Sequence, residues 1–194
     1  MMTSGSPRER VLDAVFRLVA QGGLTEASLR KVAAESGVNI GSVRHYYGTH
    51  EQLMIAAAEE VGRRMERRLN AVWPADLGES DVAARRELVE SVCRAVLPTG
   101  RDDRVELVVL LELVAAARLR PEFRPLATRM GKDLRAVLVA TLETVGVKQA
   151  ALEAERLTAL VIGLTTEFIY PHGLPDDDVV TRVLRHHIAE LLPD

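Results

Sequence analysis

The residues whose types and spacing could do chemistry gather just before position 50. Arg44, His45 and His50 can all donate hydrogen bonds, and no acidic residue occurs between Glu35 and Glu51. A phosphate backbone could therefore approach this stretch without charge repulsion. Arginine is also the side chain best suited to a bidentate contact with a guanine edge. The chemistry indicated is recognition of nucleic acid.

Short helices must position these side chains if they are to meet DNA. Ser28 suits the N-cap of a helix that ends at Gly37, and 37–39 indicates a tight turn before a helix over 40–47. Apolar spacing predicts a longer helix before them, which Gly22 and Gly23 end. Two short helices joined by a glycine-containing turn are typical of the helix-turn-helix, whose second helix enters the major groove.

The second short helix is predicted to have two different faces. If Val43 and Tyr47 face a small core, Gly41 and His45 point the opposite way. Gly41 would let the helix come close to the floor of the groove.

The start of the first short helix adds two candidate contacts. Ser28 and Arg30 could meet phosphates there, beside the positive end of the helix.

The same pattern allows a second interpretation, in which 40–47 is an ordinary short helix packed on its neighbour. The chain would then be a helical ligand-binding or interaction protein that does not bind DNA. Salt-sensitive binding to the DNA that flanks the coding region would distinguish the two hypotheses.

Catalysis is not indicated by the sequence. It contains no Gly-x-Ser-x-Gly, no His-Glu-x-x-His and no phosphate-binding glycine loop, so we expect no enzyme. His186 and His187 are adjacent and point to different faces of a helix, which disfavours a metal pair. We expect neither a metal nor a cofactor.

Composition predicts an all-α fold. The 194 residues are 47% hydrophobic, 27% charged and 4% aromatic, which suits packed helices better than sheets. The basic N-terminus lacks an apolar run, and the uncharged stretch 157–166 is far shorter than the roughly 20 residues of a membrane span. We expect a soluble cytoplasmic protein without membrane contact.

The remaining sequence predicts six further helices, giving about nine in all. Proline, glycine and acidic residues punctuate the chain, and the predicted ranges are 51–72, 81–97, 103–118, 123–145, 148–170 and 176–192. We therefore expect a DNA-binding domain over 1–49 and a helical effector-binding and dimerisation domain over 50–194.

From Arg8 to Leu53 the sequence resembles the DNA-binding domain of the TetR family of bacterial regulators. The motifs that carry the resemblance are 29–33, Leu-Arg-Lys-Val-Ala, and 37–47, Gly-Val-Asn-Ile-Gly-Ser-Val-Arg-His-Tyr-Tyr. The resemblance implies nine or ten helices, a homodimer, a palindromic operator, repression, and release when a small molecule binds the C-terminal domain.

The resemblance also assigns contacts. Those of the recognition helix fall on Ile40, Gly41, Ser42, Arg44 and Tyr46, and a phosphate contact falls on His50. The sequence departs from the family pattern at two of these positions, because the family most often has tyrosine in place of Arg44 and usually lysine in place of His50. Residues 112–118 and 163–164 are similar to a betaine-responsive branch of the family.

An effector pocket is expected among the helices of 81–145 and one face of 148–170. Its lining should be mostly Leu, Val and Ala, which suits a hydrophobic or amphipathic molecule. The candidate residues are Trp73, Cys93, Glu112, Met130, Thr165 and Phe168. Glu106 and Glu112 interrupt an apolar run, and an ion pair with an arginine such as Arg118 is an equally open interpretation of Glu112.

Dimerisation is expected to use the last two helices. Their apolar residues have the spacing of a helix bundle, which predicts a four-helix junction between subunits. The predicted seam is Leu157, Leu160, Val161, Leu164, Val179, Val183, Leu184, Ile188 and Leu191.

The charges of the chain are unevenly distributed. Residues 1–70 hold 10 Lys and Arg against 8 Asp and Glu, and the whole chain has a net charge of −3. The N-terminal part is therefore mildly basic, and residues 71–194 are acidic. Arg63, Arg64, Arg67 and Arg68 form a basic strip interleaved with glutamates, which we interpret as a solvated helix face.

Overall fold

The computed structural model describes residues 5–73, 81–97, 101–170 and 177–193, with the side chains of all but 101–103 and 177–178. Over these ranges the chain is helical and contains no strand, which confirms the predicted all-α class. The elements are α1 (Pro7–Gly22), α2 (Leu29–Ser36), α3 (Ile40–Tyr47), α4 (His50–Val72), α5 (Val82–Val96), α6 (Arg101–Ala116), the 3₁₀ helix η1 (Pro121–Phe123), α7 (Arg124–Thr144), α8 (Ala150–Ile169) and α9 (Asp177–Leu191).

Local signals set the first helix boundaries where the sequence predicts them. The Ser6 hydroxyl and the Glu9 carboxylate cap each other's backbone at the start of α1. α1 ends at Gly22, and Gly23 follows with a φ of +74°, a conformation that favours glycine. Gly37 ends α2 with a φ of +66°. α3 has the predicted bounds.

The bounds of the later helices differ from the predicted ranges by one or two residues, except that α4 ends at Val72 as predicted. α6 ends at Ala116 instead of continuing to Arg118, because the backbone tightens there. The amides of Arg118 and Leu119 bond carbonyls only three residues back, at 3.3 and 3.0 Å. The predicted helix over 123–145 begins instead as η1, followed by α7 from Arg124. Asp176, the predicted start of the last helix, lies outside the described residues.

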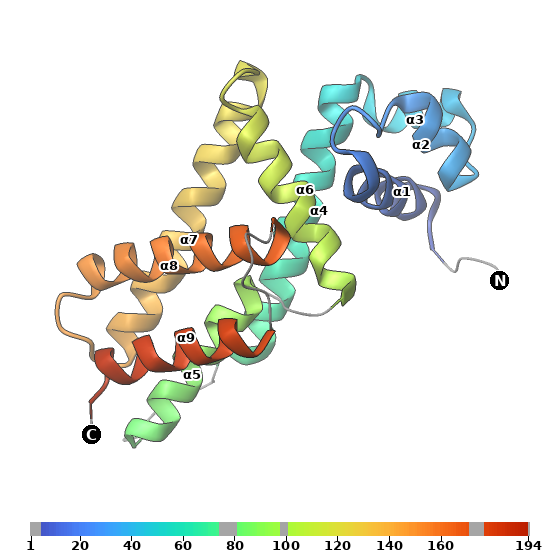
Figure 1. Cartoon of the computed structure of the whole chain (residues 1–194). Coiled ribbons are helices and arrows are strands. Elements are labelled where there is room, and N and C mark those ends of the chain that lie inside the picture. Colours follow the sequence, from blue (N-terminus) through green and yellow to red (C-terminus); the bar gives the residue numbers. More distant parts are fainter. Residues whose placement is uncertain (1–4, 74–80, 98–100, 171–176, 194) are drawn as a thin grey trace. The chain divides into compact units, whose positions relative to one another are not determined.

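The described chain forms two compact units, with boundaries inside α4 and α7. The first comprises residues 1–64 and 101–128, and the second comprises 65–100 and 129–194. In the first unit α1 packs against α2 and α6, and α2 packs against α3. Figure 1 shows α1, α2 and α3 together in blue. Fully buried residues of this unit include Val11, Val15, Val32, Val43, Leu53 and Phe123.

The second unit contains α5, α8 and α9. α9 packs against both α5 and α8 (Figure 1). Its buried side chains include Val89, Cys93, Leu138, Leu142, Leu157, Val161, Leu184 and Ile188.

This packing corrects part of the predicted dimer seam. Leu157, Val161, Leu184 and Ile188 are no more than 3% exposed in a single chain, so they fill the core of their own unit. Their helical spacing shows that one face of the helix is buried. Burial against a neighbouring helix of the same chain gives the same spacing as burial against a second subunit. The exposed large apolar side chains of α8 are Leu152 and Ile162, and Tyr170 follows the helix.

No helix among the described residues is long and apolar enough to cross a membrane.

Candidate functional site

The turn between α2 and α3 is held by side chains that cap both helices. The Ser28 oxygen accepts a hydrogen bond from the Lys31 amide at 3.3 Å, and the Asn39 Oδ1 accepts one from the Ser42 amide at 2.8 Å. Gly37, in the left-handed region, lets the chain reverse between them. α2 and α3 therefore form a rigid helix-turn-helix on α1.

The faces of α3 are as predicted. Val43 is fully buried, Tyr47 is half-buried, and Gly41, Arg44 and His45 are exposed. The other candidate contacts of this region are the exposed Arg30 and the half-buried Ser28, Ile40, Ser42 and Tyr46.

The cations of this face are available to a ligand. Arg30 and Arg44 are both exposed, and neither guanidinium makes a hydrogen bond or ion pair within the part of the chain that the structure describes. Lys31 differs, because it pairs with Glu26. An exposed arginine without a protein partner can contact a phosphate or a base without first breaking an ion pair within the protein.

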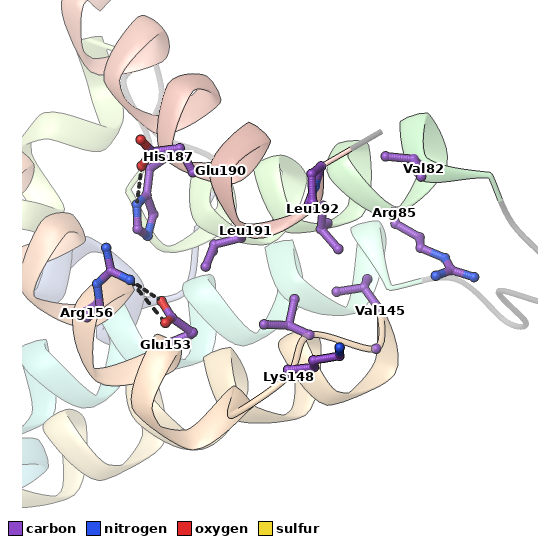
Figure 2. A pocket seen from close by; sticks show the side chains of 13 residues that line it. Val82, Arg85, Val145, Lys148, Glu153, Arg156, His187, Glu190, Leu191 and Leu192 are labelled. Carbon is purple, nitrogen blue, oxygen red and sulfur yellow. Dashed lines mark hydrogen bonds and ion pairs between the residues drawn. The ribbon is translucent and has the colours of Figure 1, made fainter.

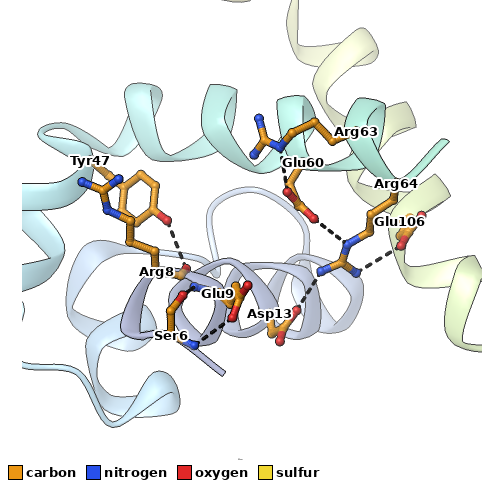
Figure 3. A network of polar contacts seen from close by, with 9 residues as sticks. All are labelled: Ser6, Arg8, Glu9, Asp13, Tyr47, Glu60, Arg63, Arg64 and Glu106. Carbon is orange, nitrogen blue, oxygen red and sulfur yellow. Dashed lines mark hydrogen bonds and ion pairs between the residues drawn. The ribbon is translucent and has the colours of Figure 1, made fainter. Parts of the chain in front are cut away.

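Arg8, which the sequence analysis missed, positions the aromatic end of α3. The Tyr47 hydroxyl donates to the Arg8 carbonyl at 3.0 Å, and the Arg8 guanidinium carbon lies 5.2 Å from the centre of the Tyr46 ring. Burial raises the pKa of Tyr47, which keeps that hydroxyl protonated as a donor. The two contacts fix α3 against the start of α1, and Figure 3 shows the one between Tyr47 and Arg8.

His50 has partners inside the first unit. Its Nε2 lies 3.2 Å from the Leu24 carbonyl oxygen, and its Nδ1 lies 3.8 Å from a Glu51 carboxylate oxygen. Thr49 and Gln52 cap each other's backbone amides at the start of α4. The phosphate contact that the resemblance assigns to His50 stays a prediction.

Arg64 joins three helices of the first unit (Figure 3). Its guanidinium donates to Asp13 of α1 at 2.9 Å, to Glu60 of α4 at 3.0 Å and to Glu106 of α6 at 3.1 Å. The guanidinium carbon also lies 4.7 Å from the centre of the Phe16 ring. The three carboxylates raise the pKa of Arg64, so its guanidinium stays charged. We call Arg64 with Asp13, Glu60 and Glu106 the Arg64 node.

This node corrects the interpretation of the basic strip. Arg64 bonds across helices, and the Arg68 Nε donates to the Ala95 carbonyl at 3.1 Å, so a solvated face is wrong for both. Arg63 does lie at the surface and pairs with Glu60. Arg64 and Arg68 lie one turn of helix apart and so share a face. Helical spacing alone does not show that this face, and not the face of Arg63 and Arg67, turns toward other helices.

The two acids of α6 have different surroundings. Glu106 is buried and pairs with Arg64. Glu112 reaches the turn after α1, where a Cβ added to Gly23 would lie 3.3 Å from its Oε2.

The effector candidates are divided between the two units. Glu112 belongs to the first unit, and the other five, Trp73, Cys93, Met130, Thr165 and Phe168, belong to the second. Cys93 is fully buried, and burial raises the pKa of its thiol to about 12. The Thr165 hydroxyl donates to the Val161 carbonyl at 2.7 Å, and Trp73 is exposed. These assignments stay predictions.

The second unit contains a pocket of about 450 Å³ that none of these candidates lines. Its walls come from the start of α5, the turn between α7 and α8, the start of α8 and the end of α9 (Figure 2). Sequence reasoning missed it because its residues come from segments that lie far apart along the chain. Among the described residues no group of three potential metal ligands is close enough to hold a metal ion.

Comparison with known proteins agrees with this geometry. Residues 11–57 match the family model of bacterial regulatory proteins of the tetR family, and residues 85–193 match that of the BetI-type transcriptional repressor C-terminal domain. The chain is 27% identical to the HTH-type transcriptional regulator PksA of Bacillus subtilis over 188 residues, which cover 95% of this chain and 89% of PksA.

Solved structures resemble the whole chain. A transcriptional regulator from Rhodococcus sp. Rha1 has a TM-score of 0.82 at 26% identity, covering 97% of this chain and 96% of that one. The multidrug binding protein EbrR in complex with ethidium has a TM-score of 0.66 at 28% identity, covering 95% and 99% of the two chains. The second family model alone spans more than half of the sequence. The chain belongs to the TetR family of bacterial transcriptional regulators.

Proposed function

We propose that the chain is a ligand-responsive transcriptional repressor that binds a palindromic operator as a homodimer. Residues 1–49 form the DNA-binding domain in this proposal, and residues 50–194 form the domain that dimerises and holds the effector. The protein would act in the bacterial cytoplasm, where its operator lies.

The observation that carries the proposal is the exposed face of α3. It presents Gly41, Arg44 and His45 on a capped helix whose opposite face is anchored by Val43. No acid occurs between Glu35 and Glu51, so the face can enter a groove between two phosphate backbones. In the proposed complex Arg44 contacts a base edge, the rest of α3 and the start of α2 contact DNA around it, and the resemblance adds His50.

An exposed apolar face supports dimerisation. Leu152 and Ile162 of α8 are 57% and 46% exposed, and Tyr170, which follows the helix, is 43% exposed. Large apolar side chains exposed on one helix are typical of a protein interface. A two-fold dimer would also double the number of base pairs that the short α3 can read.

The effector is proposed to be a small hydrophobic or amphipathic molecule. EbrR, at 28% identity, is described in complex with ethidium and with proflavin, which supports a ligand-responsive role for this chain. Such a ligand would release DNA only if it binds more tightly to the conformer whose recognition helices are wrongly spaced for the operator.

The test is binding of the purified protein to the DNA that flanks its coding region, measured by fluorescence anisotropy over a range of salt concentrations. Arg44→Ala should raise the Kd for a specific fragment about tenfold or more, because a bidentate base contact contributes about 1–3 kcal/mol. Lys132→Ala removes an exposed cation from α7 and should leave the Kd within about twofold.

Two results would overturn the proposal. One is the absence of salt-sensitive binding to any flanking fragment. The other is an Arg44→Ala variant that binds as the unaltered protein does. Either would favour a helical ligand-binding or interaction protein that does not bind DNA.

A further inference from the structure

We propose that the pocket in the second unit binds a small amphipathic organic anion, by way of Arg85 and Lys148. This site is separate from the six effector candidates, and the inference does not depend on DNA binding. The chemical class of the ligand follows from the walls of the pocket, from the unpaired side chains of Arg85 and Lys148, and from the buried Nε2 of His187.

The pocket has both apolar and charged walls, and its apolar part is formed by five Val and Leu side chains. These side chains come from α5, the turn between α7 and α8, and the end of α9 (Figure 2). They are Val82, Val145, Val147, Leu191 and Leu192. A volume of about 450 Å³ lies within the range of small-molecule sites, about 300–1,000 Å³. The pocket therefore suits a ligand with an apolar body of roughly six to ten carbon atoms.

Two cations of the lining have no protein partner to neutralise them. The side chains of Arg85 and Lys148 make no hydrogen bond or ion pair within the described part of the chain. Arg156 also lines the pocket, but its guanidinium is paired with Glu153 at 2.8 Å (Figure 2). Uncommitted cations beside apolar walls favour a ligand that carries a carboxylate or another anionic group.

The acids of the lining do not cancel this charge. Glu153 is neutralised by Arg156, and the Glu190 carboxylate lies beside the two histidines of α9, 3.6 Å from His186 and 3.9 Å from His187. Glu190 is also well exposed, so water screens it. The two cations of Arg85 and Lys148 therefore face one further carboxylate, that of Glu190, and the lining keeps an excess of positive charge.

His187 supplies a further polar group. Its Nε2 is buried and has no hydrogen-bond partner in the described residues, while its Nδ1 faces the Glu190 carboxylate. Burial lowers the pKa of His187, which favours the neutral ring. With the carboxylate on the Nδ1 side, the proton of a neutral ring sits on Nδ1 and Nε2 becomes an acceptor. A hydroxyl on the ligand would satisfy this nitrogen, since a buried polar atom without a partner is costly.

The experiment is isothermal titration calorimetry of the full chain with octanoate and with octanamide, which has a similar apolar body and no charge. We expect octanamide to bind at least tenfold more weakly than octanoate. The double variant Arg85→Gln with Lys148→Gln should raise the Kd for octanoate at least tenfold. Lys132→Gln, which removes one exposed cation elsewhere in the same unit, should leave it within about twofold.

A second comparison tests His187. The protein should prefer 3-hydroxyoctanoate to octanoate by threefold or more, and His187→Phe should abolish that preference without abolishing octanoate binding. Thermal unfolding followed by circular dichroism verifies that each variant is folded. We expect the variants to fold, because the side chains of Arg85 and Lys148 make no hydrogen bond or ion pair within the described residues.

The proposal is overturned if octanoate gives no binding heat, if octanamide binds as tightly as octanoate, or if the double variant binds octanoate as the unaltered protein does. A His187→Phe variant that keeps the preference for the hydroxylated acid would overturn the role of Nε2. Because no DNA is present, these outcomes are independent of whether the protein is a repressor.

Discussion

Cys93 is an example of a residue whose chemistry is set by its surroundings. It is fully buried on α5, and burial raises the pKa of its thiol to about 12, with Glu90 adding to the shift. Since the thiolate is the reactive form, the side chain behaves as a small apolar group of the core.

This predicts that Cys93 does not react in the native protein. Ellman's reagent at pH 8 should label all of the thiol in 6 M guanidinium chloride. Over the same time it should label less than about a tenth of the thiol in the native protein. Labelling of the native protein at the rate of a free cysteine would show that α5 opens readily, and would argue against the packing of this helix.

Ser28 can serve two purposes because a hydroxyl both accepts and donates. Its oxygen accepts the Lys31 amide and so caps α2. The hydroxyl hydrogen is left to donate to another oxygen, such as a phosphate. A side chain that caps the helix and meets the phosphate would hold the helix end and the DNA in a fixed relation.

At the scale of elements, Arg64 controls how α1, α4 and α6 are joined. The node combines a helix of the proposed DNA-binding domain with two helices of the proposed effector domain. Glu106 is only 7% exposed at its side chain, so Arg64 neutralises a charge that water cannot reach.

Arg64→Met should lower the free energy of unfolding by about 3 kcal/mol, because it removes the cation that donates hydrogen bonds to the buried Glu106 and to Asp13 and Glu60. Adding Glu106→Leu should recover part of the loss, since the buried carboxylate that Arg64 neutralises is then also removed. Urea unfolding followed by circular dichroism measures both values. A loss below about 1 kcal/mol in the single variant, or a double variant equal to the sum of the single ones, would contradict the role of the node.

These elements also show how far sequence reasoning extends. The bounds of α3 were predicted correctly because the signals lie within a few residues, with Gly37 and Asn39 before the helix and Gly48 after it. The pairing of Arg64 with Asp13 could not be predicted in the same way, because 51 residues separate them and only the packing of the helices brings them together.

The pocket illustrates the same limit. Arg85 and His187 are a hundred residues apart, and no local pattern relates them. The predicted dimer seam was wrong at Leu157 for a different reason, because an amphipathic pattern identifies the buried face and does not say which chain covers it.

At the scale of the whole molecule, the exposed apolar face of α8 is where a second copy would be expected to bind. Replacing Ile162 by glutamate would place a charge in the centre of that face, and an unpaired charge in a buried interface is strongly unfavourable. Ile162→Glu should therefore convert the dimer to a monomer in sedimentation equilibrium at micromolar concentration.

Leu119→Glu is the matched control, because Leu119 is the most exposed large apolar side chain described and lies outside α8. It should leave the dimer intact. If Ile162→Glu stays dimeric, or if both variants dissociate, the proposed interface is not on this face. A monomeric variant should also lose operator affinity, since each chain would then read only one half-site.

The contact between Tyr47 and Arg8 has a consequence for how the sequence can drift. The Tyr47 hydroxyl bonds the main-chain carbonyl of residue 8, a group that every amino acid carries. Mutation of residue 8 can remove the cation over the Tyr46 ring without removing this acceptor. A substitution of Arg8 therefore leaves the hydrogen bond between α3 and α1 in place, whereas a substitution of Tyr47 by phenylalanine removes it.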